Sequence, residues 1–435
     1  MEWLHRWSLI SGPTPWVVTV LGAMGGLWLV LAPATGAHMY RRRLVPIAFL
    51  VAIGTTAGLW LVVEKWWRPF PDPIEPEIYL WIGCAFLAAL LLAARLVSDR
   101  RVWRAIVSVA ATAVVLAAAA VSVNLVFAAY PTVGDAFGIP TAEEIAFDEV
   151  PPGSPVVTGT PLEAVWHPPA SLPAEGRVTS APIPGTVSGF QARNAQIYLP
   201  PAYFVAPRPL LPVLILLAGQ PGEPEDWLTG GRLTETMDAF AADHGGLAPV
   251  VVVADGTGSQ LADPLCLDSR LGNVATYLAT DVPAWVKSNL QVNPDPRSWA
   301  IGGLSYGGTC SLQMATNYPQ VYPTFLDLSG ELEPSRGDRT RTVAEAFGGD
   351  ASKFTAVNPI DLMTTRKYPD TAGAFVVGRD DTEYKHSAGQ VYEAAKNAGM
   401  DVHYVELPGG HSFAVWSAGL THELDWLARR LGLIG

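Results

Sequence analysis

Charged residues are scarce in this sequence. Asp, Glu, Lys and Arg make up 16% of the 435 residues, whereas hydrophobic residues make up 49%. A soluble globular protein has about 25% charged residues, so this composition indicates a chain that is partly embedded in a membrane. The formal net charge of −12 also argues against nucleic acid as a partner, because an acidic surface and the phosphate backbone repel each other.

Four apolar stretches in the first 130 residues contain no Asp, Glu, Lys or Arg away from their ends. Each approaches the length of about 20 residues that crosses a bilayer as a helix. An intramembrane charge is the usual mark of a transport pathway, so we expect these stretches to act as an anchor. Residues 1–130 are therefore predicted to form a transmembrane region with four helices, at roughly residues 16–31, 44–63, 78–96 and 105–129.

The loops between these stretches differ in charge. Residues 38–43 and 95–104 concentrate Arg, whereas residues 64–77 are acidic and rich in Pro. Positively charged loops stay on the cytoplasmic side, so the N-terminus and everything after about Tyr130 are predicted to be extracytoplasmic. The run Ala32–Ala34 imitates a signal-peptide cleavage site, but cleavage there would leave the arginines of the first loop outside, against this rule.

Cysteine is nearly absent, with three residues in the whole chain. Cys84 lies in the third apolar stretch and is expected to be a plain apolar residue. Cys266 and Cys310 fall in the part predicted to be extracytoplasmic, where oxidising conditions permit a disulfide. A sequence does not give the distance between two thiols, so two separate buried cysteines are the alternative.

Cofactor-binding motifs are also missing. The run LGAMGG at residues 21–26 imitates a glycine-rich nucleotide loop, but it lies inside a predicted membrane helix. Asp263 and Asp268 flank Cys266 without a recognisable spacing of metal ligands. We expect no cofactor and no metal.

The rest of the chain divides into a proline-rich segment and an alternating pattern. Residues 131–175 are dense in Pro without periodicity, which predicts a semi-extended linker. In residues 176–435, continuous apolar runs alternate with helix-like segments, which is typical of an α/β fold with a mostly parallel sheet. The expected strands are 194–200, 211–219, 248–256, 298–303, 324–330, 372–378 and 402–409, and the expected helices are 233–244, 275–290, 309–318, 387–399 and 419–432.

A Gly-x-Ser-x-Gly motif at residues 303–307 lies between an expected strand and an expected helix. In that context the serine, Ser305, occupies the sharp turn that exposes a nucleophile at the edge of an α/β-hydrolase sheet. Serine alone is a poor nucleophile and needs a histidine base that is oriented by a carboxylate. In this fold the acid and then the histidine follow the serine along the chain.

Four histidines follow Ser305. We assign the base to His411, which lies in a glycine-rich loop between the last strand and the last helix. His403 alternates within a strand and His422 lies in the last helix, so both are expected to be structural, and His386 begins a helix in a less suitable place.

The acid is expected just after the strand at residues 372–378. Asp381 is preferred to its neighbour Asp380 there. Glu331 is a second alternative because some hydrolases carry the acid one strand earlier, whereas Asp327 inside that strand is expected to be structural.

Acyl transfer also needs N–H donors that face the developing oxyanion. One is expected to be the backbone N–H of Tyr306, directly after the nucleophile. The second should come from the loop after the strand at residues 211–219. Pro221 has no N–H, which leaves Gln220, with Gly219 as the alternative. The side chain of Gln220 could instead only cap the loop.

These residues carry a family resemblance. Residues from about 185 to 435 resemble the esterase D / antigen 85 group of α/β-hydrolases, through the runs LLAGQPGEPEDW, DVPAWV, GGLSYGG, FLDLSGELEP, GRDDTEY and GGHSFAVW. The resemblance implies that Ser305, Asp381 and His411 form the triad and that Gln220 and Tyr306 supply the oxyanion donors. The group includes carboxylesterases, feruloyl esterases and mycolyltransferases. The secreted mycolyltransferases lack a four-helix anchor, and no counterpart of their sugar-binding residues is evident here.

The sequence therefore predicts a membrane-anchored, extracytoplasmic serine esterase whose substrate is an acyl ester, of an envelope lipid or glycolipid. One alternative is an acyltransferase that passes the acyl group to a sugar or lipid hydroxyl. The other is a hydrolase-shaped envelope interaction protein without catalysis.

Overall fold

The computed structural model describes residues 2–32, 37–70, 72–99 and 101–435. It contains two compact units, Met1–Ile139 and Pro140–Gly435. Pro33 and Ala34, in the run that imitates a cleavage site, lie outside the described residues.

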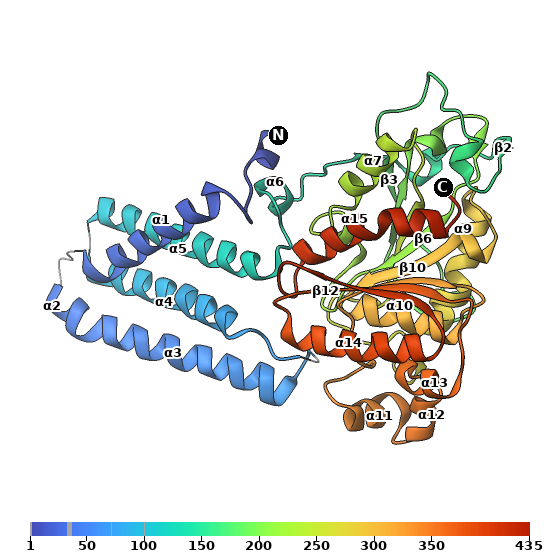
Figure 1. Cartoon of the computed structure of the whole chain (residues 1–435). Coiled ribbons are helices and arrows are strands. Elements are labelled where there is room, and N and C mark those ends of the chain that lie inside the picture. The colour runs from blue at the N-terminus through green and yellow to red at the C-terminus, as the bar shows by residue number, and fades with distance from the viewer. Residues whose placement is uncertain (1, 33–36, 71, 100) are drawn as a thin grey trace. The chain divides into compact units, whose positions relative to one another are not determined.

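The first unit consists of long apolar helices (Figure 1). Four helical stretches are long and apolar enough to cross a membrane, and each contains most of one predicted span. Helix α5 packs against α1 and α4, and α4 packs against α3. Gly22 and Gly25 allow the close approach of α1 and α5, because a Cβ added at either position would lie 2.4 Å from Cβ of Ala118 or 2.7 Å from the carbonyl of Ala111. The helices are α1 (Pro13–Leu31), α2 (Ala37–Met39), α3 (Val45–Leu61), α4 (Pro76–Ser98), α5 (Val102–Phe127) and α6 (Val133–Ala136), and the second membrane-length stretch is Tyr40–Trp67.

Arg95 was expected both at the end of the third predicted span and at the start of an arginine-rich loop. It lies in the last turn of α4, and its buried guanidinium donates to the backbone carbonyls of Trp28, Leu29 and Ala32. These carbonyls belong to the last turn of α1 and its C-cap, Ala32, whose own N–H also donates to the carbonyl of Trp28. Arg95 therefore ties the ends of α1 and α4 together.

The second unit has a nine-stranded sheet in the order β1-β3-β4-β7-β6-β10-β11-β12-β13. The six strands from β7 to β13 are parallel, and β4 is antiparallel to both of its neighbours. The mostly parallel α/β fold predicted from the sequence is confirmed. The sheet strands are β1 (Glu143–Glu144), β3 (Arg177–Ala181), β4 (Ala195–Leu199), β6 (Val213–Leu217), β7 (Val250–Ala254), β10 (Trp299–Leu304), β11 (Thr324–Leu328), β12 (Ala372–Gly378) and β13 (Asp401–Leu407); the short strands outside it are β2 (Val156–Val157), β5 (Arg208–Pro209), β8 (Asp268–Ser269) and β9 (Gly272–Asn273).

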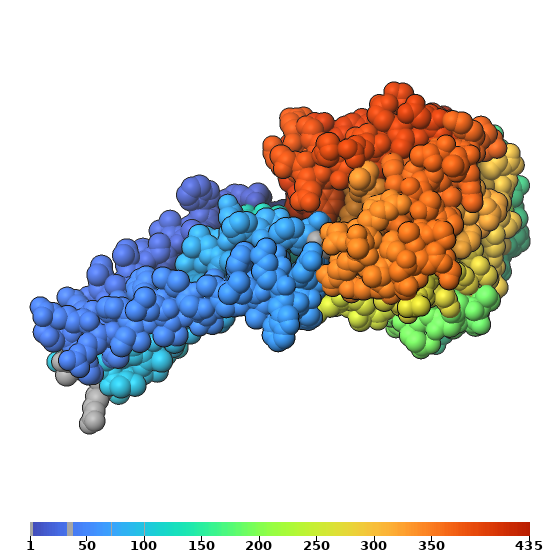
Figure 2. Space-filling model, turned by 90° about the horizontal axis from the view of Figure 1, so that it is seen from below, coloured from blue at the N-terminus to red at the C-terminus, as the bar shows by residue number. Residues whose placement is uncertain are grey.

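Helices cover both faces of this sheet. In Figure 1, α7 and α15 lie on one face, while α10 and α14 lie on the other. A group of helices between β11 and β12 was not expected from the sequence, and much of the orange surface in Figure 2 belongs to this part of the chain and to α14. The helices of the unit are α7 (Leu233–Asp243), α8 (Val274–Thr276), α9 (Val282–Asn289), α10 (Tyr306–Asn317), α11 (Arg339–Phe347), α12 (Ala351–Thr355), α13 (Pro359–Thr365), α14 (Thr382–Asn397) and α15 (Phe413–Arg430).

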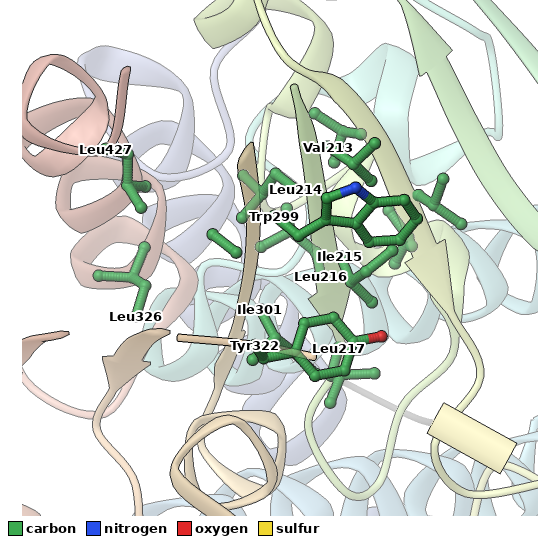
Figure 3. Close-up of a cluster of buried hydrophobic side chains, with 14 of the residues drawn as sticks. Val213, Leu214, Ile215, Leu216, Leu217, Trp299, Ile301, Tyr322, Leu326 and Leu427 are labelled. Carbon is green, nitrogen blue, oxygen red and sulfur yellow. The ribbon is translucent and has the colours of Figure 1, made fainter. Parts of the chain in front are cut away.

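The core lies between the central strands and the helices that cover them (Figure 3). All five residues of β6 are completely buried, as are Ile301 and Tyr322. Trp299 is also buried, and its indole N–H donates to the carbonyl of Asn293, so this large ring fills the core without leaving a polar atom unsatisfied. The candidate nucleophile, Ser305, directly follows the last residue of the buried strand β10.

Residues 140–175, most of the semi-extended linker predicted at residues 131–175, belong to the second unit and pack within it. Glu143 and Glu144 of β1 pair with β3, and Leu162 and Trp166 are buried in the core of the unit. The indole N–H of Trp166 donates to the carbonyl of Gly245. Burial of these two apolar side chains stabilises the packed arrangement, which proline content alone did not reveal.

Candidate active site

The turn at Ser305 has the geometry of a nucleophile elbow. Ser305 joins β10 to α10 with φ of 53° and ψ of −118°, a strained conformation for a residue with a side chain. A Cβ on Gly303 would lie 2.4 Å from the backbone of Gly307, and a Cβ on Gly307 would lie 2.4 Å from the carbonyl oxygen of Leu217. Both glycines are therefore required for the close approach of strand, turn and helix.

The neighbours of β10 determine which loops surround the serine. β10 pairs with β6 and β11, so the loops after these strands lie at the same sheet edge as Ser305. The backbone N–H of Ser305 donates to the carbonyl of Leu328 at 2.7 Å. A Cβ on Gly219 would lie 3.6 Å from Cβ of Ser305, which puts the start of the loop after β6 directly beside the serine.

The structure brings Ser305, His411 and Asp381 together. Nε2 of His411 lies 2.9 Å from Oγ of Ser305, and Nδ1 of His411 lies 2.8 Å from Oδ2 of Asp381. A carboxylate beside Nδ1 favours the tautomer with the proton on Nδ1, which leaves Nε2 to accept the serine proton. This chain of hydrogen bonds can turn the hydroxyl of Ser305 into a nucleophile.

Asp381 is held at the start of α14. It is 7% exposed and accepts a hydrogen bond from the backbone N–H of Tyr384 as the N-cap of that helix. A Cβ on Gly378 would lie 2.4 Å from the carbonyl oxygen of Gly409, so the glycine at the end of β12 lets the His411 loop pass close by.

The other three carboxyl groups considered for the triad acid have different surroundings from Asp381. Asp380 is exposed, in contrast to the buried Asp381. Glu331 lies after β11, and its backbone N–H donates to Oγ1 of Thr309. Asp327 is buried within β11, where Oδ1 accepts from the N–H of Gly330 and burial raises the pKa of the carboxyl to about 7. Neither hydrogen bond involves His411.

The other three histidines have different partners. His403 and His422 both contact the buried Glu423, through Nε2 at 2.7 Å and Nδ1 at 2.9 Å. The pKa of His403 is raised mainly by this hydrogen bond to Glu423. His386 is exposed on α14 and contacts Gln390.

Two aromatic rings that the sequence analysis did not single out hold the imidazole of His411. Tyr384 stacks on it with ring centroids 3.9 Å apart, and Trp416 meets it edge-on at 4.9 Å. Both residues lie within the sequence runs GRDDTEY and GGHSFAVW. Tyr384 follows Asp381 by three residues in the first turn of α14, and Trp416 follows His411 by five residues in the first turn of α15. This closeness in sequence to two triad residues was the available signal.

The two expected oxyanion donors, Tyr306 and Gln220, lie in the segments that follow β10 and β6, which are neighbouring strands. Tyr306 is the first residue of α10, and the N–H of a first helical residue has no acceptor within the helix. Gln220 follows Gly219 in the loop beside the serine, and its side-chain amide donates to the carbonyl of Leu261 at 3.1 Å. The capping role considered for this side chain therefore exists. The backbone N–H of Gln220 stays the predicted oxyanion donor.

The side chain of Tyr306 connects α10 to the loop that follows β7. Its hydroxyl donates to the carbonyl of Gly256 and accepts from the N–H of Cys266. Burial raises the pKa of this hydroxyl well above its usual value, so it stays protonated. Cys266 is also joined by a disulfide to Cys310, with the two Cα atoms 5.5 Å apart. The loop after β7 is thus attached to the nucleophile's helix at two points.

Among the described residues, no group of three or more His, Cys, Asp or Glu side chains is arranged to hold a metal ion. The groups that can take part in a reaction are those of an acyl-transfer site: a serine, a histidine, a carboxylate and backbone donors.

Residues 190–427, more than half of the chain, match the family described as putative esterase. An uncharacterised protein of Corynebacterium glutamicum is 39% identical over 440 residues, which cover 99% of this chain and 100% of that protein. A diacylglycerol acyltransferase/mycolyltransferase Ag85C of Mycobacterium avium is 44% identical over 62 residues, 14% of this chain and 17% of that protein.

The structure is similar to that of a ferulic acid esterase, with a TM-score of 0.52 at 18% sequence identity over 59% of this chain and 99% of that one. At this identity the likeness shows the fold alone. Together with the family match, it gives the fold class predicted from the sequence. The chain belongs to this esterase family of α/β-hydrolases and is an enzyme of the serine hydrolase or acyltransferase kind.

Proposed function

We propose that the protein is a membrane-anchored, extracytoplasmic serine esterase that cleaves acyl esters through an acyl-enzyme at Ser305. The observation that carries the proposal is the hydrogen-bond chain from Ser305 through His411 to Asp381. The hydroxyl oxygen of Ser305 attacks the ester carbonyl while Nε2 of His411 takes its proton. Asp381 orients the imidazole and stabilises its charged form.

The tetrahedral intermediate then collapses. The backbone N–H groups of Tyr306 and Gln220 hold its oxyanion, and His411 returns the proton to the departing alcohol oxygen. In the second half-reaction, water gives a proton to His411 and attacks the acyl carbon, which releases the acid and restores Ser305.

Labelling tests this assignment. The full-length protein in detergent is treated with a fluorophosphonate probe, and the labelled residue is identified by mass spectrometry. We expect labelling at Ser305 and its loss in Ser305→Ala. The control is Ser288→Ala, since Ser288 is exposed on α9 and its hydroxyl donates to the carbonyl of Ala284 one turn before it. Labelling that persists in Ser305→Ala would overturn the assignment.

Membrane insertion is supported by four helical stretches of sufficient length and apolarity. The orientation rests on the arginines around Arg42 and in residues 95–104, which favour the cytoplasmic side. In a Cys84→Ala background, a membrane-impermeant maleimide should label Ser288→Cys in intact cells, whereas Arg42→Cys should react only after lysis. The reverse pattern would contradict the proposed orientation.

The substrate proposed is an acyl ester of an envelope lipid or glycolipid, because a membrane anchor keeps the enzyme near such esters. Transfer to a hydroxyl acceptor is the second candidate, favoured by the 62-residue match to a protein named as an acyltransferase/mycolyltransferase. A labelled acyl ester supplied with and without trehalose separates the two. Free acid in both samples indicates hydrolysis, whereas a labelled sugar ester indicates transfer.

A further inference from the structure

Arg193, which lies just before β4, connects two loops at the catalytic edge of the sheet. Its Nη2 donates to the carbonyl of Gly222 at 2.9 Å, in the loop after β6. The same nitrogen lies 2.9 Å from Oδ1 of Asp255 and 2.7 Å from Oγ1 of Thr257, in the loop after β7. Nε lies 3.1 Å from Oδ2 of Asp255. One guanidinium therefore fixes the relative position of both loops.

Asp255 makes this connection rigid. Its side chain is 1% exposed and accepts the backbone N–H of Arg193 at 2.7 Å as well as the guanidinium. It also accepts the N–H groups of Thr257 and Gly258. Burial by itself would raise the pKa of Asp255, but the hydrogen bonds from Arg193 lower it overall, so the carboxylate stays charged. A bidentate pair between a guanidinium and a buried carboxylate has a defined geometry.

The loop that Arg193 holds is the one beside the nucleophile. Gly222 is two residues after Gln220, the proposed oxyanion donor, and Gly219 at the start of the loop approaches Cβ of Ser305. The N–H of Gly222 donates to the carbonyl of Gln260, and the Gln220 side chain donates to that of Leu261. Both contacts join the loop after β6 to the loop after β7. They therefore depend on the relative position of the two loops, which the bonds of Arg193 fix.

We propose that Arg193 is a positioning residue, which sets the backbone N–H of Gln220 at hydrogen-bonding distance from the developing oxyanion through its bonds to Gly222 and Asp255. The inference rests on the proposed function of Ser305. An oxyanion donor acts within about 2.7–3.1 Å of the oxygen, so a loop that shifts by about 1 Å loses most of its effect.

The expected result is a loss of turnover without a loss of substrate binding. Removal of one oxyanion donor lowers kcat about 10²–10³-fold. Arg193→Gln displaces the donor and should lower kcat about 10–100-fold, while KM for p-nitrophenyl butyrate changes less than about twofold. Arg193→Lys keeps the charge but lacks the planar fork, and its kcat should fall between those of Arg193→Gln and the wild type.

Inhibition by phenylboronic acid distinguishes positioning from general stability. The inhibitor forms a tetrahedral anionic adduct with a catalytic serine, so its affinity depends on the oxyanion donors. Its inhibition constant should rise across the Arg193 variants by the same factor by which kcat/KM falls. All measurements use the full-length protein in detergent, well below the Tm of each variant.

Arg297→Gln is the matched control. Arg297 also pairs with an aspartate, Asp295 at 2.8 Å, but its side chain is 86% exposed and precedes β10 at the opposite edge of the sheet. It should leave kcat and the inhibition constant unchanged. A wild-type kcat and a wild-type inhibition constant in the Arg193 variants would overturn the inference, as would a raised KM with unchanged kcat. If Arg193→Gln does not fold, Arg193→Lys decides in the same way. Wild-type turnover by Ser305→Ala would instead refute the proposed function itself.

Discussion

Oδ2 of Asp381 lies 2.8 Å from Nδ1 of His411, whereas Asp380, the preceding residue, is exposed at the same turn. Two adjacent carboxylates thus form a matched pair for a test of the triad acid. Asp381→Asn should lower kcat about 10³–10⁴-fold with little change in KM, because an amide neither stabilises the imidazolium nor enforces the required tautomer. Asp380→Asn should keep wild-type kcat. Turnover of an ester by both variants in detergent is the measurement, and equal losses would contradict the assignment.

Gly307 offers a test of the elbow. A Cβ at this position would lie 2.4 Å from the carbonyl oxygen of Leu217 and 2.7 Å from that of Ala218, and backbone atoms cannot move aside cheaply. Gly307→Ala should therefore abolish fluorophosphonate labelling and lower the Tm.

Gly389→Ala is the control for this substitution. Gly389 lies within α14, and a Cβ there would meet no atom within 4 Å. Alanine has the better helix propensity, by about 1 kcal/mol, so this variant should be as stable as the wild type or more stable, and fully labelled. Unimpaired labelling of Gly307→Ala would show that the elbow tolerates a side chain.

How far the sequence predicted this structure depends on the range of the interactions. All seven expected strands overlap strands of the central sheet. Six of them are parallel, and a buried parallel strand is a continuous apolar run that can be recognised locally. The seventh, β4, is antiparallel to both of its neighbours. β3 was not predicted because apolar and polar residues alternate only weakly in Arg177–Ala181. The helices α11–α13 were not predicted because their segment is polar.

The site shows the same division. The elbow and the loop histidine have local signatures, so Ser305 and His411 could be selected from their neighbours in sequence. The ring contacts of Tyr384 and Trp416 with His411, and the bonds from Arg193 to Asp255, depend on tertiary packing. Arg193 and Asp255 are separated by 62 residues, and neither belongs to a motif that was recognised.

The disulfide between Cys266 and Cys310 closes a loop with a sequence separation of 44 residues. A loop of this length restricts the unfolded chain enough to stabilise the folded state by about 2–4 kcal/mol. The double variant Cys266→Ser/Cys310→Ser should therefore have a Tm lower by about 5–10 °C. Differential scanning fluorimetry of the full-length protein measures this shift. Cys84→Ala, which changes the cysteine outside the disulfide, should leave the Tm within about 2 °C, and an equal Tm of the double variant would show that the bond does not stabilise the fold.

Asp327 should make stability depend on pH. Burial raises its pKa to about 7, and the hydrogen bond from Gly330 only partly opposes this, while in the unfolded chain an Asp titrates near about 3.9. Between these values the folded state binds more protons than the unfolded state, so the free energy of unfolding falls as pH rises from about 4 to about 7. The slope from this one group is at most about 1.4 kcal/mol per pH unit.

Asp327→Asn removes the titration while its side-chain oxygen can still accept the N–H of Gly330. The Tm of this variant relative to the wild type should therefore increase between pH 4.5 and pH 7.5, in matched detergent and ionic strength. Asp380→Asn serves as the control, since it changes an exposed carboxyl and should give a constant difference. If Asp327→Asn and the wild type show parallel curves, Asp327 is ionised in the folded state at the lower pH, and the buried site must then provide a partner for its charge.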